Sequence, residues 1–137
     1  MKIRLAACLC LLAVFPTATL WARTHHTATQ DPEDPGYVFA LAAADHFLHA
    51  WQTGDLENGM VQLSDGIRRS QNADSLERFF SEGKERSFEI ARGHGHPGQY
   101  SFPVVLHFSR GSHATRRSSQ MILVDTGKND WAVDRLP

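Results

Sequence analysis

Hydrophobic residues recur at helical spacing near the start of the predicted domain. Between positions 37 and 51 the large or apolar residues lie three or four apart: Tyr37, Leu41, Ala44, Leu48 and Trp51, with Ala40 and Phe47 beside them. This spacing predicts an amphipathic helix over residues 37–51. Gly54 and Asp55 follow it, and a left-handed glycine before an N-capping aspartate is typical of a corner between two helices. We therefore interpret Asp55 as a helix cap rather than a reactive carboxylate.

Two further helices are predicted before the pattern changes. Residues 56–63 form the second, and a turn at residues 64–66 ends it. Asp74 and Glu77, three positions apart, have the spacing of a capping box and predict a third helix. Gly83 ends this helix. The helical part of the chain is thus expected to comprise three elements.

The period of the pattern changes from helical to two after this glycine. Residues 99–109 give the longest alternation, with one face formed by Tyr100, Phe102, Val104, Leu106 and Phe108. Shorter alternations predict strands over residues 87–94, 120–125 and 131–136, and the glycine-rich segment 93–98 is typical of a hairpin loop. This order predicts an α+β fold, in which three N-terminal helices pack in the concavity of a strongly curved antiparallel sheet of about four long strands.

Residues 1–22 have the layout of a secretory signal peptide. Two basic residues precede an apolar run over residues 5–15, and the small residue Ala22 provides an exit for cleavage. The run is too short for a membrane span, so we expect an exported protein, periplasmic or secreted, without a stable span. Residues 23–36 are polar and contain two prolines, which predicts a flexible leader and leaves residues 37–137 as one domain.

Composition and charge narrow the classes of function. Both cysteines, Cys8 and Cys10, lie in the segment expected to be removed, so the domain has no disulfide and no cysteine nucleophile. The chain holds 14 basic and 15 acidic residues, and loss of the signal peptide removes basic residues only. No clustered basic face is expected, and we predict no nucleic-acid partner. The pair Arg116 and Arg117 is interpreted as a solvated surface feature.

Four short segments of the domain carry a resemblance to a known superfamily. They are Phe47-x-x-Ala50-Trp51-x-x-Gly54-Asp55-x-Glu57, Leu63-Ser64-Asp65-Gly66, Leu76-x-x-Phe79-Phe80 and Trp131-Ala132-Val133-Asp134. With them the domain resembles the nuclear transport factor two-like superfamily, the cone-shaped α+β fold of ketosteroid isomerases, SnoaL-like cyclases and many exported domains. The resemblance implies a pocket between the sheet and the first helix. In the isomerases a base carboxylate follows on a short strand, whereas residues 67–70 hold no carboxylate here.

Candidate catalytic residues are scattered along the chain. The carboxylates of Asp125 and Asp65 and the imidazole of His107 are candidates for a general base, with Tyr100 as a hydrogen-bond donor beside Asp125. Asp125 also precedes a Thr-Gly turn, where an aspartate is favoured for turn formation. The sequence contains no Gly-x-Ser-x-Gly motif and no phosphate-binding glycine loop, so we expect neither a hydrolase of that type nor a cofactor.

Two histidines in the predicted hairpin loop are candidate metal ligands. His94 and His96 flank Gly95, a spacing that can place two imidazoles near one ion. A zinc site needs one or two further ligands, and His107, His113 or Asp125 could supply them only through a folding arrangement that spacing does not prove. We interpret the pair as part of a solvated hairpin and expect no resident metal.

The leading hypothesis is an exported, non-catalytic domain that binds a small apolar ligand or a protein partner. The residues expected to line its pocket are Phe47, Trp51, Phe80, Tyr100, Phe102, Val104, Leu106 and Trp131. One alternative is a pocket enzyme of isomerase or cyclase type that uses a carboxylate or histidine base. The other is a homodimerisation module of an envelope assembly. A homodimer would pair through the outer sheet face, which carries Val105, Ile122 or Val124 with Ser101 and His107.

Overall fold

The computed structural model describes residues 34–127 and 130–137. This part of the chain contains the helices α1 (Pro35–Thr53), α2 (Leu56–Val61), α3 (Asp65–Ser70) and α4 (Ala73–Ser81). They are followed by the strands β1 (Lys84–Ile90), β2 (His94–His96), β3 (Gln99–Arg110), β4 (His113–Gly127) and β5 (Asp130–Arg135). The predicted signal peptide and residues 23–33 of the predicted leader lie outside the described residues.

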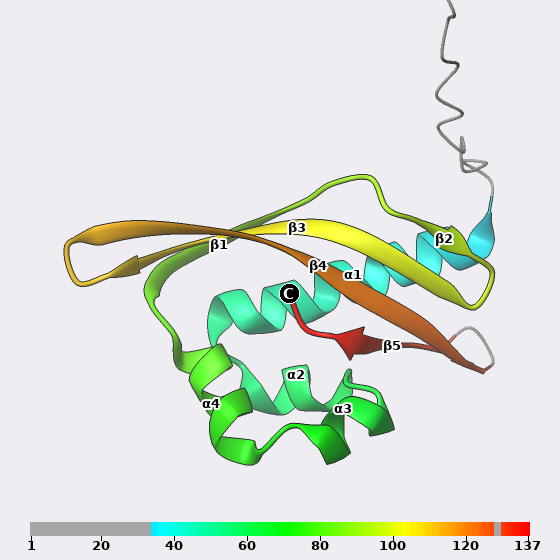
Figure 1. Ribbon diagram of the computed structural model, residues 1–137, viewed down its shortest axis with the longest axis horizontal. Coiled ribbons are helices and arrows are strands. Elements are labelled where there is room, and N and C mark those ends of the chain that lie inside the picture. The colour runs from blue at the N-terminus through cyan, green and yellow to red at the C-terminus, as the bar shows by residue number, and fades with distance from the viewer. Residues whose placement is uncertain (1–33, 128–129) are drawn as a thin grey trace, which may run out of the picture.

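The helices occupy the concave side of a curved antiparallel sheet. In Figure 1 the sheet arches over α1, and α2, α3 and α4 lie on the other side of α1. Helix α1 accordingly contacts β1, β3, β4 and β5 on one side and α2 and α4 on the other. The predicted α+β cone is therefore confirmed. None of the described helices is long and apolar enough to cross a membrane.

A capping aspartate begins helix α1, and a glycine in the left-handed conformation ends it. Asp34 is its N-cap, because its Oδ1 accepts a hydrogen bond from the Gly36 amide at 3.0 Å, and Pro35 occupies the first turn. Gly54 ends the helix with a left-handed φ of 75°. Asp55 then caps α2 by accepting a bond from the Asn58 amide at 3.0 Å, and this bond lowers the pKa of Asp55. The predicted helix-to-helix corner is confirmed.

Two details of the helical layer differ from the prediction. Residues 65–70, which were expected to contain a turn and no helix, form α3, because the Ser64 hydroxyl accepts a hydrogen bond from the Ile67 amide at 3.2 Å and caps a new helix. The predicted cap of the last helix, Asp74, is wrong. Asn72 is the N-cap of α4, since it has extended dihedral angles and accepts from the Ser75 amide at 2.7 Å.

The sheet has the strand order β1-β3-β4-β5, and the short strand β2 pairs separately with β3. All of these pairs are antiparallel. Strand β4 is longer than the predicted 120–125, because it pairs with the whole length of β3, from Gln99 opposite Val124 to Arg110 opposite His113. Leu63 forms a parallel bridge with Val133, so the chain before α3 lies against the outer edge of β5.

The concave face of the sheet and the inner side of α1 form one hydrophobic core. Every second residue of β3 from Tyr100 to Phe108 is buried. Aromatic rings pack against one another in this core, among them Tyr37 with Tyr100 and Phe47 with Phe80. All eight residues that the sequence assigned to a pocket lining are buried in it: Phe47, Trp51, Phe80, Tyr100, Phe102, Val104, Leu106 and Trp131. They contribute to the packing that holds the layers together.

Candidate functional site

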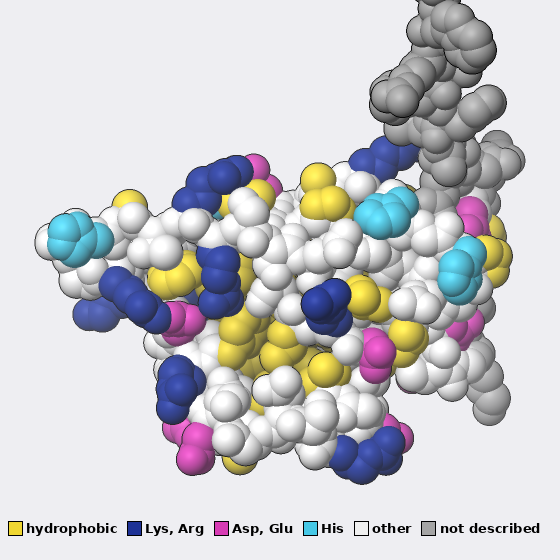
Figure 2. All heavy atoms as spheres, viewed as in Figure 1, with side chains coloured by type: hydrophobic (Ala, Val, Ile, Leu, Met, Phe, Trp, Pro, Cys, Tyr) yellow, Lys and Arg dark blue, Asp and Glu magenta, His cyan; other side chains and the backbone are white. Residues whose placement is uncertain are grey.

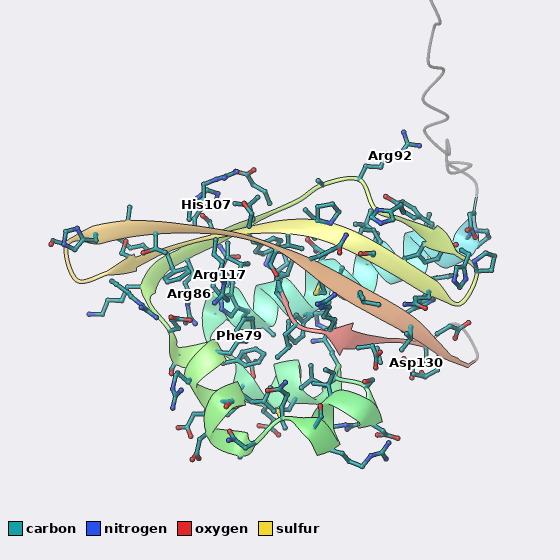
Figure 3. All side chains as sticks on the ribbon, in the orientation of Figure 1. Phe79, Arg86, Arg92, His107, Arg117 and Asp130 are labelled. Atoms are coloured by element: carbon teal, nitrogen blue, oxygen red, sulfur yellow. The ribbon has the colours of Figure 1, made fainter. Side chains whose placement is uncertain are left out.

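Charged and aromatic side chains gather where the β3–β4 hairpin passes the end of α4. We call this group the arginine–aromatic cluster and define it as Phe79, Glu82, Phe108, Arg110 and Arg117. Figure 3 shows Arg117 extending from the sheet toward Phe79 on α4, with Arg86 beside it. The cluster joins the end of α4 to the β3–β4 hairpin, whose tip extends beyond the helices in Figure 1.

The end of α4 places the carboxylate of the cluster. Helix α4 stops at Ser81, and Glu82 takes an extended conformation. Gly83 then adopts a left-handed φ of 78°, and a Cβ at this position would lie 2.7 Å from Cδ2 of Phe108. Only glycine fits here without strain, because a side chain would meet the Phe108 ring and would also disfavour the backbone conformation. The turn thus brings Glu82 next to the two arginines of the hairpin.

The register of the hairpin directs Arg117 to the concave side of the sheet. Arg117 pairs with Leu106, whose side chain is buried, and therefore shares its face. Its guanidinium carbon lies 5.8 Å from the centre of the Phe79 ring and 5.9 Å from that of Phe108. Arg110 also lies over Phe108, at 5.9 Å. Both guanidinium groups therefore rest against aromatic faces, which attract cations.

The charges of the cluster are unequal. The Glu82 side chain is only 16% exposed, and it forms an ion pair with Arg110 and lies 3.7 Å from a terminal nitrogen of Arg117. Burial lowers the pKa of Arg117, and the positive charge of Arg110 lowers this pKa further. The Nε of Arg117 is buried without a hydrogen-bond partner among the described residues. One carboxylate therefore serves two arginines, and Arg117 is the less well satisfied of the two.

A third arginine beside the cluster has a structural role. Arg86 donates to the carbonyl oxygen of Phe80 at the end of α4, and its guanidinium carbon lies 5.7 Å from the centre of the Trp51 ring. The indole of Trp51 in turn donates to the Phe79 carbonyl oxygen at 3.1 Å. These contacts join the ends of α1 and α4 to β1. Cations are favoured at helix C-termini, which accounts for the position of Arg86.

The cluster borders surface that is open to solvent. A hollow of about 480 Å³ lies between the end of α4, β1 and the hairpin, and Arg110 lines it together with Ser81, Gly83, Lys84, Glu85, Ser109 and Gly111. Figure 2 shows hydrophobic side chains at the surface between the sheet and the helical layer, with Lys and Arg side chains around them. The arrangement presents cationic N–H donors beside aromatic and aliphatic surface.

The three predicted base candidates belong to different elements, and none of them is part of this cluster. The Asp125 carboxylate is exposed and accepts a bond from the Gly127 amide at 2.7 Å, as expected for a turn residue. Asp65 is exposed and pairs with Arg68 at 2.7 Å. His107 lies on the outer face of the sheet and contacts Glu89 at 3.2 Å. Each of the three thus has a partner of its own, in a turn, on a helix or on the outer sheet face.

The structure gives the Tyr100 hydroxyl, which was expected beside Asp125, a partner at the start of α1. The hydroxyl donates to Oδ2 of Asp34, the N-cap of α1, which the sequence had placed in the leader. The two candidate metal ligands, His94 and His96, are exposed in β2, and Nδ1 of His96 contacts the Pro97 carbonyl at 3.0 Å. Within residues 34–127 and 130–137 the structure gathers no third histidine, cysteine or carboxylate around them.

The interpretation of Arg117 as a solvated surface residue is corrected by the structure. Arg116 is exposed on the outer face, whereas Arg117 is half-buried on the concave face. The signal was present in the sequence: Arg117 has the same parity as Met121 and Leu123, so extending the predicted strand backward by a few residues would have turned it inward. Arg110 lies beyond the end of the strand predicted over residues 99–109, and Glu82 is the last residue before the glycine that ends the predicted helix, so neither carried a comparable signal.

Comparisons with known proteins identify the fold. No protein-family model and no curated protein matches the chain. A SEC-C motif containing protein from Rhodopseudomonas palustris matches with a TM-score of 0.59 and 10% identity, over 69% of this chain and 73% of that one. The structure named Rd1NTF2_04 with long sheet matches with a TM-score of 0.55 and 17% identity, over 69% and 94% of the two chains.

An enzyme also shares this architecture. An LEH-like epoxide hydrolase from M. tuberculosis matches with a TM-score of 0.53 and 16% identity, over 73% of this chain and 84% of that one. At such identities the likeness concerns the fold and does not extend to activity. The helix order, the curved antiparallel sheet and these matches agree with the resemblance found in the sequence. The chain has the nuclear transport factor two-like fold.

Proposed function

We propose that this chain is an exported, non-catalytic binding domain that takes a small, largely apolar ligand at the open end of its cone. One observation carries the proposal: the concave interior is packed with its own aromatic side chains, whereas the arginine–aromatic cluster at the open end places the exposed Arg110 and the half-exposed Arg117 beside apolar surface. Ligand sites typically combine apolar lining with a few polar groups that fix orientation.

The positions of the candidate bases support binding over proton transfer. A general base must come within hydrogen-bond reach of the proton that it removes, about 2.6–3.2 Å. Asp125 is engaged in a turn, Asp65 in a pair with Arg68, and His107 lies on the opposite face of the sheet from the cluster. Neither arginine of the cluster is suited to remove a proton near neutral pH, because a guanidinium stays protonated.

The proposal is tested by mapping ligand contacts with nuclear magnetic resonance. A ¹⁵N-labelled domain is titrated with a mixture of small aromatic and aliphatic compounds, both neutral and charged. We expect the amide resonances that shift most to belong to the end of α4 and the facing part of β4, around Phe79 and Arg117. The controls are the amides of residues whose side chains lie on the outer sheet face, such as Ser101 and Val105 in β3.

Two outcomes would contradict the proposal. Shifts confined to the outer face, with none at the cluster, would place any binding surface elsewhere. Turnover of an added compound, detected as new product signals that depend on Asp125, Asp65 or His107, would favour the pocket-enzyme alternative.

A homodimer is the second candidate, and the outer sheet face favours it. The middle of this face carries uncharged residues in register: Ser101 opposite Ile122, Pro103 opposite Gln120, and Val105 opposite Ser118. Val105 and Ile122 are half-buried in the single chain, and charged groups such as the Glu89–His107 pair lie at the border. An apolar centre with a polar border is the usual composition of a protein interface. A two-fold axis through this face would bring the same residues of two copies together.

Replacing Val105 by glutamate is expected to weaken this dimer at least about tenfold, because an unpaired charge would be buried at its centre. Size-exclusion chromatography with light scattering measures the change as a shift from dimer to monomer mass over a concentration series. Val38→Glu on the exposed face of α1 is the matched control, since Val38 lies outside this face. A wild-type chain that runs as a monomer at high concentration would refute the dimer.

A further inference from the structure

We infer that the ligand of this domain carries a carboxylate, and that Arg117 and Arg110 are the residues that recognise it. The inference rests on the proposed function and adds the chemical class of the ligand: a monocarboxylate attached to an aromatic or aliphatic body. It depends on the charge balance of the cluster, the geometry of its guanidinium groups and the apolar surface next to them.

The charge balance leaves room for one more negative charge. Arg110 and Arg117 face each other across Glu82, so the three groups together carry a surplus of one positive charge. Lys84 and Glu85, which line the adjoining hollow with Arg110, offset each other. A monocarboxylate would offset this surplus with a single charge.

The geometry of Arg117 suits a planar anion. Its planar guanidinium lies near the Phe79 and Phe108 rings, and its N–H donors form a fixed fork in one plane. Its nearest carboxylate oxygen, from Glu82, is 3.7 Å away, which is longer than a hydrogen bond. The side chain is 39% exposed, and ligand oxygens can therefore reach its terminal nitrogens from solvent. A guanidinium edge matches a carboxylate with two parallel hydrogen bonds.

Glu82 holds the two arginines in place for this anion. Glu82 is mostly buried, and its ion pair with Arg110 holds that guanidinium near the Phe108 ring. The guanidinium of Arg117 lies near the same ring. Burial disfavours the charged form of Arg117, so a second carboxylate would restore part of the lost stabilisation. The body of the ligand would then rest on the hydrophobic surface between the sheet and α4.

The test compares an acid with its neutral counterpart. The mature chain is titrated with 4-phenylbutyrate and with 4-phenylbutyramide, which differ in the charged group alone, and affinities are measured by calorimetry. We expect the acid to bind at least about tenfold more tightly, the usual effect of charge-assisted hydrogen bonds. The Nε–Hε resonance of Arg117 should shift with the acid and not with the amide.

Substitutions assign the effect to one residue. Arg117→Gln should weaken binding of the acid at least about tenfold and leave the amide unchanged, and Arg117→Lys should recover only part of the loss, because lysine lacks the planar fork. Arg116→Gln is the matched control, since Arg116 neighbours Arg117 in sequence but lies exposed on the opposite face. It should change the affinity by less than about twofold. Circular dichroism confirms that each variant is folded.

The outcomes separate this inference from the proposed function. If acid and amide bind equally, or if Arg117→Gln binds the acid as the wild type does, the inference is overturned while the binding proposal stands. If no probe binds and no resonance shifts, both are overturned. Acetyl-Ala-Ala-Phe, as free acid and as C-terminal amide, distinguishes the source of the carboxylate: preference for this acid over 4-phenylbutyrate indicates a peptide C-terminus, and the reverse indicates a small metabolite.

Discussion

Replacing Trp51 by alanine is expected to lower the free energy of unfolding by about 3–5 kcal/mol, the range for truncation of a large core side chain. Trp51 is only 1% exposed and lies between the helical layer and the sheet. Its indole donates to the Phe79 carbonyl at 3.1 Å, and its ring contacts Phe79, Phe108 and the guanidinium of Arg86. Alanine would leave a cavity, an unpaired carbonyl and a cation without its aromatic partner.

Urea unfolding followed by circular dichroism measures this loss. Val38→Ala serves as the control, because Val38 lies on the same helix but is 53% exposed, and its loss should change stability by no more than about 0.5 kcal/mol. Trp51→Phe would keep most of the packing and remove the hydrogen bond. Its free energy of unfolding should therefore lie between those of the wild type and Trp51→Ala. If the free energy of unfolding of Trp51→Ala were less than about 1 kcal/mol below that of the wild type, the contacts of Trp51 would not be what joins the helical layer to the sheet.

Alanine substitutions at two helical glycines, Gly59 and Gly66, should change the stability of the fold in opposite directions. Gly59→Ala is expected to destabilise the fold by about 2 kcal/mol or more, because the added Cβ would lie 2.0 Å from Cζ of Phe80. Phe80 cannot move away easily, since it is buried against Phe47 and Phe79. Gly66→Ala meets no atom closer than 3.5 Å and should stabilise α3 by about 0.5 kcal/mol, the gain from reduced backbone freedom.

The comparison needs only the unfolding midpoints of the two variants and the wild type. Because both substitutions add the same methyl group in a helix, helix propensity alone would move the two midpoints in the same direction. Opposite shifts would therefore report the tight contact between α2 and α4 at Gly59. A stabilised Gly59→Ala variant would mean that Phe80 has space to adjust.

The sequence was sufficient for the elements with a strong pattern. Helix α1 was predictable because its apolar stripe runs for several turns and ends at a glycine and an aspartate with well-defined capping chemistry. The inward face of β3 was predictable because its large residues alternate without interruption from Tyr100 to Phe108. Long periodic segments leave one way to bury their apolar face, and the fold class followed from their order.

The candidate site was not predictable, for reasons that lie in the same patterns. The first half of β4 carries polar residues on both faces, so no alternation showed that the strand begins at His113, and without that start the inward parity of Arg117 could not be used. Glu82 meets Arg110 and Arg117 only after α4 and the hairpin have packed together. The bond between Tyr100 and Asp34 likewise joins residues that are 66 positions apart. Such contacts depend on tertiary packing, which local spacing does not encode.

The bridge between Leu63 and Val133 has a consequence for aggregation. The Ser64 amide donates to the Val133 carbonyl at 2.9 Å, and the Val133 amide donates to the Gln62 carbonyl at 2.8 Å. These bonds occupy backbone groups that an edge strand would otherwise offer to a foreign strand. At the opposite edge, the Gln52 amide group donates to the Arg86 carbonyl at 2.9 Å. Both borders of the sheet are therefore partly shielded from the strand-by-strand stacking of copies that leads to fibrils.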